Sequence, residues 1–204
     1  MARPKNYDED AVLSAAMHAF RRHGYGPLSI KQLEDSTGLK AGSIYNSFGD
    51  KAGLFEAALA HYNDKVVQGR IDTHLPPGKG VPGLQALFLS LLKEPDGGRH
   101  GCLLTNTAIE FGGAVRDEAP GRAHLQAGLE RLRKAFARVL SEARAAGDLP
   151  PGIDIPTTAL QLLTLYQGIL VLVRSASVDD RSLRRLIGAE FRPLQGIHTQ
   201  KNMP

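Results

Sequence analysis

A short stretch near the N-terminus, residues 40–51, combines side chains that donate hydrogen bonds with very small ones. Lysine, serine, tyrosine and asparagine can donate to the phosphates of a nucleic acid or to base edges. Small residues let a backbone approach a surface closely, and Gly42 inside a helix costs roughly 1 kcal/mol relative to alanine. The pattern indicates a surface that binds an extended anion at close range, with Lys40, Ala41, Gly42, Ser43, Tyr45, Asn46 and Lys51 as its candidates.

The single cysteine of the chain gives a second chemical possibility. Cys102 lies at the start of a predicted helix beside Arg99 and His100, and a helix N-terminus and neighbouring cations both lower the pKa of a thiol. A reactive thiolate is one interpretation. A small, buried, apolar side chain is the other.

Four polar residues are further candidates for a small-molecule site. Asn106 and Glu110 follow Cys102 at four-residue steps, on one helical face that either lines a cavity or is solvated. Tyr166 and Gln167 interrupt an apolar segment, where they line a pocket or make interface hydrogen bonds. Together with Cys102 they form the set of effector or sensor candidates.

No constellation of catalytic or metal-binding residues is apparent in the sequence. His100 near a cysteine does not establish a nucleophile and base, and the seven histidines show neither HxxxH nor HExxH spacing. The chain also lacks a Walker loop and a GxGxxG fingerprint. We therefore expect no metal, no cofactor and no enzymatic activity, with a helical enzyme that uses the cysteine as the alternative.

Composition indicates a folded protein but identifies no partner. The 204 residues are 42% apolar with a formal net charge of +4, and residues 1–70 hold nine Lys or Arg against eight Asp or Glu. The N-terminal MARPKNYDED lacks the apolar core of a signal peptide. The apolar run of residues 160–173 is 14 residues long, shorter than the roughly 20 that a membrane helix needs. We expect a cytoplasmic protein without a membrane partner.

The donors of residues 40–51 lie on a predicted helix-turn-helix. Apolar spacing is helical nearly throughout, which predicts an all-α fold. The first helix spans about 8–23, a second begins at Ser29 with capping-box spacing and ends at Gly38, and a third spans about 41–48. Two short helices across a glycine turn are typical of DNA-binding proteins.

A longer helix is predicted from Asp50 to near Gly69, with Val66 on its inner stripe. The Pro- and Gly-rich residues 74–83 mark the main boundary. Later helices are predicted over about 83–93, 102–112, 117–146, 155–176 and 179–191. The expected domains are a helix-turn-helix domain over 1–50, a connecting helix over 51–70, and a helical effector-binding and dimerisation domain over 71–204.

Residues 8–66 resemble the DNA-binding domain of the TetR family of bacterial transcriptional regulators. The residues that carry the resemblance are Phe20, Gly24, Tyr25, Ser29, Ile30, Leu33, Gly38, Leu39, Gly42, Ser43, Ile44, Tyr45, Phe48, Lys51, Leu54 and Phe55. The resemblance implies that Ser29, Tyr45 and Lys51 bind phosphates, whereas Gly42, Ser43 and Asn46 lie in or beside the groove. It is also compatible with an N-terminal arm, Arg3 and Lys5, that reaches along the DNA.

Two positions depart from the family pattern. Glu34 stands where a small alanine is common, and Lys40 stands where a serine-like N-cap is common. We expect Glu34 to point to solvent, whereas Lys40 alters the start of the third helix or its phosphate contacts.

The resemblance implies a C-terminal domain that dimerises and holds a ligand pocket. Dimerisation also follows from the small number of base pairs that one helix-turn-helix contacts, since two units on a two-fold axis read half-sites about 34 to 36 Å apart. The last two helices are the expected interface, although the same side chains could form intrachain core. The candidates are Leu160, Leu163, Ile169, Leu170, Leu183, Leu186 and Ile187.

The sequence thus predicts a homodimeric, ligand-responsive regulator of transcription, a repressor released from double-stranded operator DNA by a small molecule or a thiol-reactive signal. A DNA-binding regulator without any ligand response is the main alternative.

Overall fold

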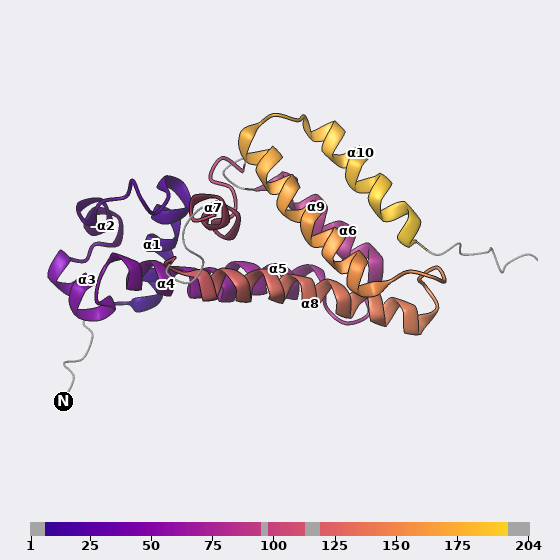
Figure 1. Ribbon diagram of the computed structural model, residues 1–204, viewed down its shortest axis with the longest axis horizontal. Coiled ribbons are helices and arrows are strands. Elements are labelled where there is room, and N and C mark those ends of the chain that lie inside the picture. The colour runs from indigo at the N-terminus through magenta and orange to yellow at the C-terminus, as the bar shows by residue number, and fades with distance from the viewer. Residues whose placement is uncertain (1–6, 95–97, 113–118, 196–204) are drawn as a thin grey trace, which may run out of the picture. The chain divides into compact units, whose positions relative to one another are not determined.

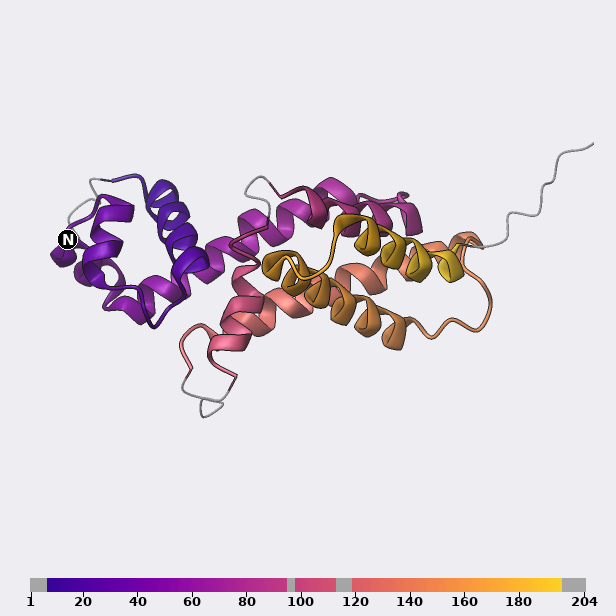
Figure 2. The same cartoon turned by 90° about the horizontal axis from the view of Figure 1, so that it is seen from above.

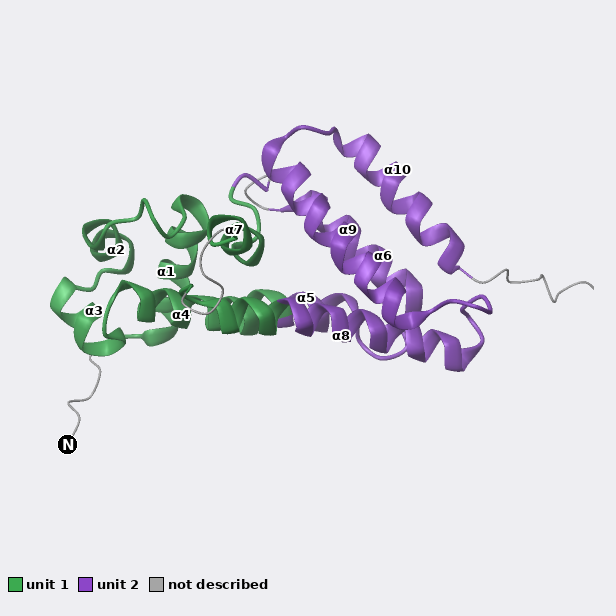
Figure 3. Cartoon of the chain, viewed as in Figure 1, with its two compact units in different colours: residues 1–67, 100–128 green, residues 68–99, 129–204 purple. Residues whose placement is uncertain are grey.

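The structure, a computed structural model, describes residues 7–94, 98–112 and 119–195 (Figure 1). Across these residues the regular elements are all helices, which confirms the predicted all-α class. Two compact units divide the chain (Figure 3): residues 1–67 with 100–128 form unit 1, and residues 68–99 with 129–204 form unit 2. Arg3 and Lys5, the predicted arm, lie outside the described residues.

The first three helices begin and end where the sequence predicts. Helix α1 (Glu9–His23) starts at Asp8, whose carboxylate accepts hydrogen bonds from two backbone N–H groups of the first turn. Helix α2 (Ile30–Thr37) begins with a complete capping box between Ser29 and Gln32. It ends at Gly38, which has the left-handed conformation with φ 74° that favours glycine. Helix α3 (Ala41–Phe48) follows and completes the helix-turn-helix.

The core of unit 1 holds the helix-turn-helix against α4 (Lys51–Tyr62). Helix α1 packs on α2 and α4, and α3 also packs on α4. The ring of Phe20 meets that of Phe55 edge-on at 4.9 Å, a favoured aromatic geometry. The core side chains that are at most 1% exposed include Phe20, Leu28, Leu33, Ile44, Leu54 and Phe55.

The long connecting helix differs from its prediction. After α4 the chain forms a π-helical segment, Asn63–Val67, and then α5 (Gln68–His74), so helix continues past Gly69. Val66, expected on the inner stripe, is half-exposed, and Val67 is buried instead. The π segment explains this shift, because its i to i+5 spacing moves the inward position one residue along the chain.

Unit 1 also contains α7 (Leu103–Glu110) and the start of α8 (Arg122–Ala146). The predicted start of this last helix near residue 117 is not matched at residues 119–121, which form a turn. Gly121 there has φ 74°, and a left-handed residue interrupts a helix.

Unit 2 is built from α5, α6 (Gly80–Ser90), the rest of α8, α9 (Ile155–Ser175) and α10 (Asp180–Phe191), with short 3-10 turns at Leu91–Lys93 and Arg192–Leu194. Helix α6 begins within the segment predicted as a linker, because Pro82 is tolerated in a first helical turn. Figures 1 and 2 show α9 and α10 side by side. The core is an aromatic cluster of Phe88, Phe136, Tyr166 and Phe191, with ring centroids 5.0 to 6.0 Å apart.

Helix α9 is longer than its apolar run indicates. With 21 residues, it is long and apolar enough to cross a membrane by length and composition, so the expectation that this segment is too short to span one is wrong. The described chain has no other helix of which this is true, and the core helix of a soluble protein passes the same test. Only 39% of its most apolar 18-residue segment is buried, and Leu160 and Val171 are exposed beside polar residues such as Gln161 and Thr164.

Candidate nucleic-acid interface

The outward face of α3 carries the donors that the sequence singles out. Gly42, Ser43, Tyr45 and Asn46 are all exposed, whereas Ile44 between them is fully buried. The Tyr45 ring is 48% exposed, an unusual position for a large aromatic side chain that has no partner surface to cover it. Ile44 therefore anchors the helix, and its neighbours form a polar surface with one projecting ring.

Gly42 is not required by packing within the chain. A Cβ atom built at this position meets no atom within 4 Å, and its φ is not in the left-handed region. The glycine thus weakens α3 without serving the fold.

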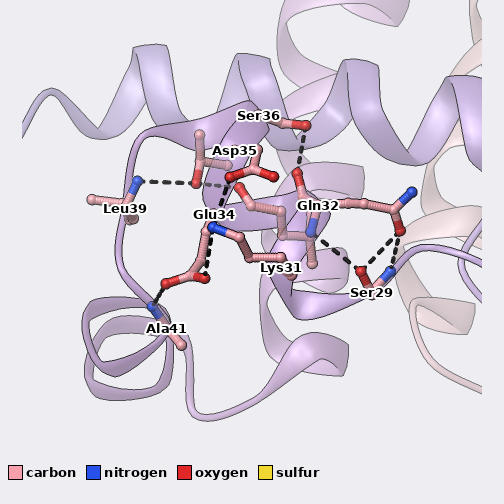
Figure 4. Close-up of polar contacts among 10 residues, drawn as sticks. Ser29, Lys31, Gln32, Glu34, Asp35, Ser36, Leu39 and Ala41 are labelled. Carbon is pink, nitrogen blue, oxygen red and sulfur yellow. Dashed lines mark hydrogen bonds and ion pairs between the residues drawn. The ribbon is translucent and has the colours of Figure 1, made fainter.

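The start of α3 is organised differently from the expectation. Lys40 is the N-cap residue, but its side chain makes no capping hydrogen bond. The Ala41 N–H instead donates to Oε1 of Glu34 at 2.7 Å (Figure 4). The expectation that Glu34 points to solvent is wrong, because its side chain reaches back across the turn and is only 18% exposed.

Ser29 is exposed, but its hydroxyl is occupied in the capping box. Its Oγ accepts from the Gln32 N–H at 3.2 Å and donates to Gln32 Oε1 at 2.9 Å. A phosphate contact through this hydroxyl therefore requires that the proton turn away from Gln32.

Lys51 is held against unit 1 and does not extend freely into solvent. Its Nζ lies 4.4 Å from the centre of the Tyr25 ring and donates to the Gly26 carbonyl at 3.3 Å. Burial lowers the pKa of Lys51, and the nearby Glu110 carboxylate opposes that shift. The cation is thus placed beside the start of α4 by an aromatic ring.

Glu110, predicted either to line a cavity or to be solvated, is exposed and binds the loop between α1 and α2. Its two carboxylate oxygens accept hydrogen bonds from the Tyr25 N–H at 2.9 Å and the Gly26 N–H at 2.6 Å. Phe111, the next residue, packs its ring 5.4 Å from that of Tyr25. The end of α7 therefore holds the loop that precedes the helix-turn-helix, a contact that no local sequence pattern reveals.

Asn106 makes a second connection between α7 and α1. Its side chain is 8% exposed and donates to the backbone carbonyls of Arg21, at 3.1 Å, and His100, at 2.9 Å. The Arg21 guanidinium in turn donates to the Gly101 carbonyl. These contacts fix the segment before α7 to the last turn of α1.

Cys102 is the N-cap residue of α7, as its predicted place at a helix start implies. It is 5% exposed, and the Tyr62 hydroxyl donates to its sulfur at 3.3 Å. The thiol is thus buried beside a tyrosine hydroxyl.

A small pocket of about 170 Å³ lies between the end of α7 and the start of α8. None of the five predicted effector residues lines it. Its lining includes Thr107, Phe111, Pro120, Arg122 and Leu125. In the described part of the chain no group of His, Cys, Asp and Glu side chains could hold a metal ion.

Tyr166 lies in the core of unit 2, 3% exposed, where its hydroxyl accepts a hydrogen bond from Arg70 at 3.3 Å. Arg70 also forms an ion pair with Glu94, whose side chain is 11% exposed. Gln167 is half-buried on the adjacent face of α9. The two residues therefore do not share one environment.

The predicted dimer residues divide into two groups. Ile169, Leu170, Leu183 and Ile187 are at most 5% exposed and belong to the core of unit 2. Leu160 and Leu186 are 54% and 41% exposed, and Leu163 is half-buried. Val171, which sequence reasoning omitted, is 40% exposed on α9.

A helix-turn-helix with a polar, exposed second helix, attached to a separate helical unit, defines a DNA-binding regulator of transcription. Family models agree with this class: residues 12–58 match "Bacterial regulatory proteins, tetR family", and residues 80–188 match "Tetracyclin repressor-like, C-terminal domain". The second match covers more than half of the chain. The protein belongs to the TetR family.

The similarity to relatives and solved structures extends over most of the chain. The HTH-type transcriptional repressor ComR of Escherichia coli K12 is 28% identical over 93% of this chain and 90% of its own length. The repressor AcnR of Corynebacterium efficiens is 27% identical over 84% of this chain and 85% of its own. A cysteine mutant of the TetR family regulator CifR, complexed with 26-base-pair operator DNA, is 26% identical with a TM-score of 0.80, covering 95% and 100% of the two chains.

Proposed function

We propose that the protein represses transcription by binding double-stranded operator DNA as a homodimer, with α3 of each protomer in the major groove. The exposed polar face of α3 around Tyr45 carries this proposal. Two named relatives are repressors, and the CifR structure contains operator DNA. The residues proposed to contact DNA are Ser29, Lys40, Ala41, Gly42, Ser43, Tyr45, Asn46 and Lys51.

The test is titration of the purified protein onto DNA from upstream of its own gene at near-physiological salt, with scrambled DNA as competitor. We expect binding to the upstream DNA at least 10³-fold tighter than to scrambled DNA, the usual lower range for specific recognition. Equal affinity for both would overturn the proposal. The variant Tyr45→Ala should weaken binding to both DNAs, because the expected partner of the projecting ring is a phosphate.

We further propose that α9 and α10 form the dimer interface. The exposed apolar side chains of these helices support this, since Leu160 and Val171 lie on the outer side of α9 and Leu186 lies on α10. Isolated exposed apolar side chains are ordinary, but two leucines and a valine on α9 and α10 indicate a surface that another chain covers.

The proposed regulatory signal is a small molecule or a thiol-reactive compound that acts through α7. Glu110 and Asn106 connect α7 to the loop and helix that precede α2, so an effector that binds a displaced α7 more tightly would release the helix-turn-helix from its operator conformation. We propose no catalytic role and a cytoplasmic location, in keeping with such a regulator.

A further inference from the structure

At the turn between α2 and α3, the N-cap residue of α3 does not cap the helix with its own side chain. A helix leaves its first backbone N–H groups without intrahelical partners, and a serine, threonine, aspartate or asparagine at the N-cap normally satisfies one of them. In this chain the N-cap of α3 is Lys40, whose ammonium group is a donor and cannot fill that role.

Glu34 on α2 supplies the missing acceptor. Its Oε1 accepts from the Ala41 N–H, the first of α3, at 2.7 Å (Figure 4). Its own backbone carbonyl accepts from the Gly38 N–H at 2.8 Å, the bond that ends α2. One residue therefore holds both the end of α2 and the start of α3.

The neighbouring acid, Asp35, offers a contrast. Lys31 lies within ion-pair distance of both carboxylates, at 3.7 Å from Glu34 and 3.0 Å from Asp35. Asp35 is 64% exposed and contacts Lys31 on the same helix, whereas Glu34 is 18% exposed and reaches α3. The two acids share charge and a partner but differ in the contact to α3.

We propose that Glu34 is the positioning residue of the recognition helix, providing from α2 the cap that residue 40 does not provide. Because the cap comes from elsewhere, residue 40 can be a lysine that faces the DNA. Glu34 fixes the angle at which α3 leaves the turn, and Lys40 adds a cation at the same end of the helix. This inference rests on the proposed DNA-binding function.

A double-mutant comparison tests the inference. Lys40→Ser and Lys40→Ala both remove the cation, but only serine can cap α3. Serine at residue 40 would accept from the Gly42 or Ser43 N–H, next to the Ala41 N–H that Glu34 accepts, so in the wild-type background Lys40→Ser should melt only slightly above Lys40→Ala. In the Glu34→Ala background, the ratio of affinity for upstream DNA to affinity for scrambled DNA should be about five-fold higher in Lys40→Ser than in Lys40→Ala. The serine variant should also melt at a higher temperature than the alanine variant.

Asp35→Ala is the matched control, which removes an acid and a partner of Lys31 without touching α3. Glu34→Ala should lower the specificity ratio about five-fold relative to wild type, and Asp35→Ala should leave it unchanged. Equal loss in the two variants would overturn the inference, because charge and not capping would then explain the effect. Indistinguishable serine and alanine variants in the Glu34→Ala background would overturn it as well.

The stability readout separates this inference from the proposed function. If wild-type protein fails to prefer its upstream DNA, the proposed function fails, but the melting temperatures of the four variants still report whether Glu34 caps α3. If wild type binds specifically and the serine variant gives no rescue, only the positioning role is wrong.

Discussion

The carboxylate of Glu110, the last residue of α7, accepts a hydrogen bond from the Gly26 N–H at 2.6 Å, although the two residues are 84 positions apart in the chain. The same carboxylate lies close above Gly24, where a Cβ atom would stand 3.1 Å from Oε2. A side chain larger than hydrogen at residue 24 would press on this contact, and the φ of 81° at Gly24 also favours glycine. The loop between α1 and α2 is thus shaped around an acid from α7.

Replacing Glu110 with alanine should loosen this loop. Two backbone N–H groups lose a charged acceptor, which is worth about 1 to 3 kcal/mol, at the lower end for an exposed carboxylate. Amide hydrogen exchange should therefore accelerate at Tyr25 and Gly26. Glu142→Ala, which breaks an ion pair with Arg138 within α8, is the control and should leave these amides unchanged. Protection that persists in Glu110→Ala would show that the carboxylate does not hold the loop.

Gly42→Ala should make the protein more stable and its DNA binding weaker. Alanine is favoured over glycine in a helix by about 1 kcal/mol, and a Cβ atom here meets nothing in the chain. Urea unfolding would measure the gain, and operator titration the loss. Gly69→Ala in α5 is the matched control, since a Cβ atom there also meets no other atom. It should stabilise the protein without altering its affinity for the operator. A Gly42→Ala variant with full operator affinity would exclude close approach of α3 to DNA at this position.

Lys51→Ala should weaken binding to all DNA sequences and reduce the slope of log affinity against log salt by about one. The alanine variant also removes the packing of the lysine stem on Tyr25, so Lys51→Met is the better test, because it keeps most of the stem and removes the charge. Both variants should show the same change of salt slope. An unchanged slope in Lys51→Met would mean that Lys51 only packs on the ring.

The helix-turn-helix could be predicted from the sequence because its signals are local. The capping box at Ser29 and Gln32, the left-handed Gly38 and the buried position of Ile44 all depend on residues within one or two turns. The same was true of the cap at Asp50. Local hydrogen-bond chemistry leaves few alternatives at such positions.

The contacts of Glu34, Glu110 and Asn106 could not be predicted, because each joins elements whose packing no periodicity encodes. A glutamate on a short helix is expected on the solvated surface, and only the turn that follows brings the Ala41 N–H to it. The π-helical segment, which moved the inward position from Val66 to Val67, likewise has no signal in the apolar spacing. The leucines and isoleucines of α9 and α10 were predicted either as one interface or as intrachain core, and only the exposure of each side chain separates Leu160 and Leu186 from the core.

Burial of Cys102 predicts restricted thiol chemistry. At 5% exposure, the sulfur should react with a bulky aromatic disulfide reagent at least tenfold more slowly in native than in urea-unfolded protein. If the thiol is nevertheless the sensor, small oxidants should release DNA from wild type but not from Cys102→Ser. Release of DNA from both proteins would exclude the thiol and leave a non-covalent effector. Tyr62→Phe removes the hydroxyl that donates to the sulfur. It should change the reaction rate of the thiol in the native protein but not in the unfolded protein.

Leu160→Glu should convert the proposed dimer to a monomer without unfolding the chain. The side chain is 54% exposed in the single chain, so glutamate there meets water in a monomer but would be buried without a partner in a dimer. Sedimentation velocity would report the mass. Ile109→Glu, at a residue on α7 that is 66% exposed, is the matched control and should remain dimeric. Because two helix-turn-helix units on one axis read both half-sites, the monomer should also lose its preference for a full operator over a half-site. A dimeric Leu160→Glu protein would place the interface elsewhere than on the outer face of α9.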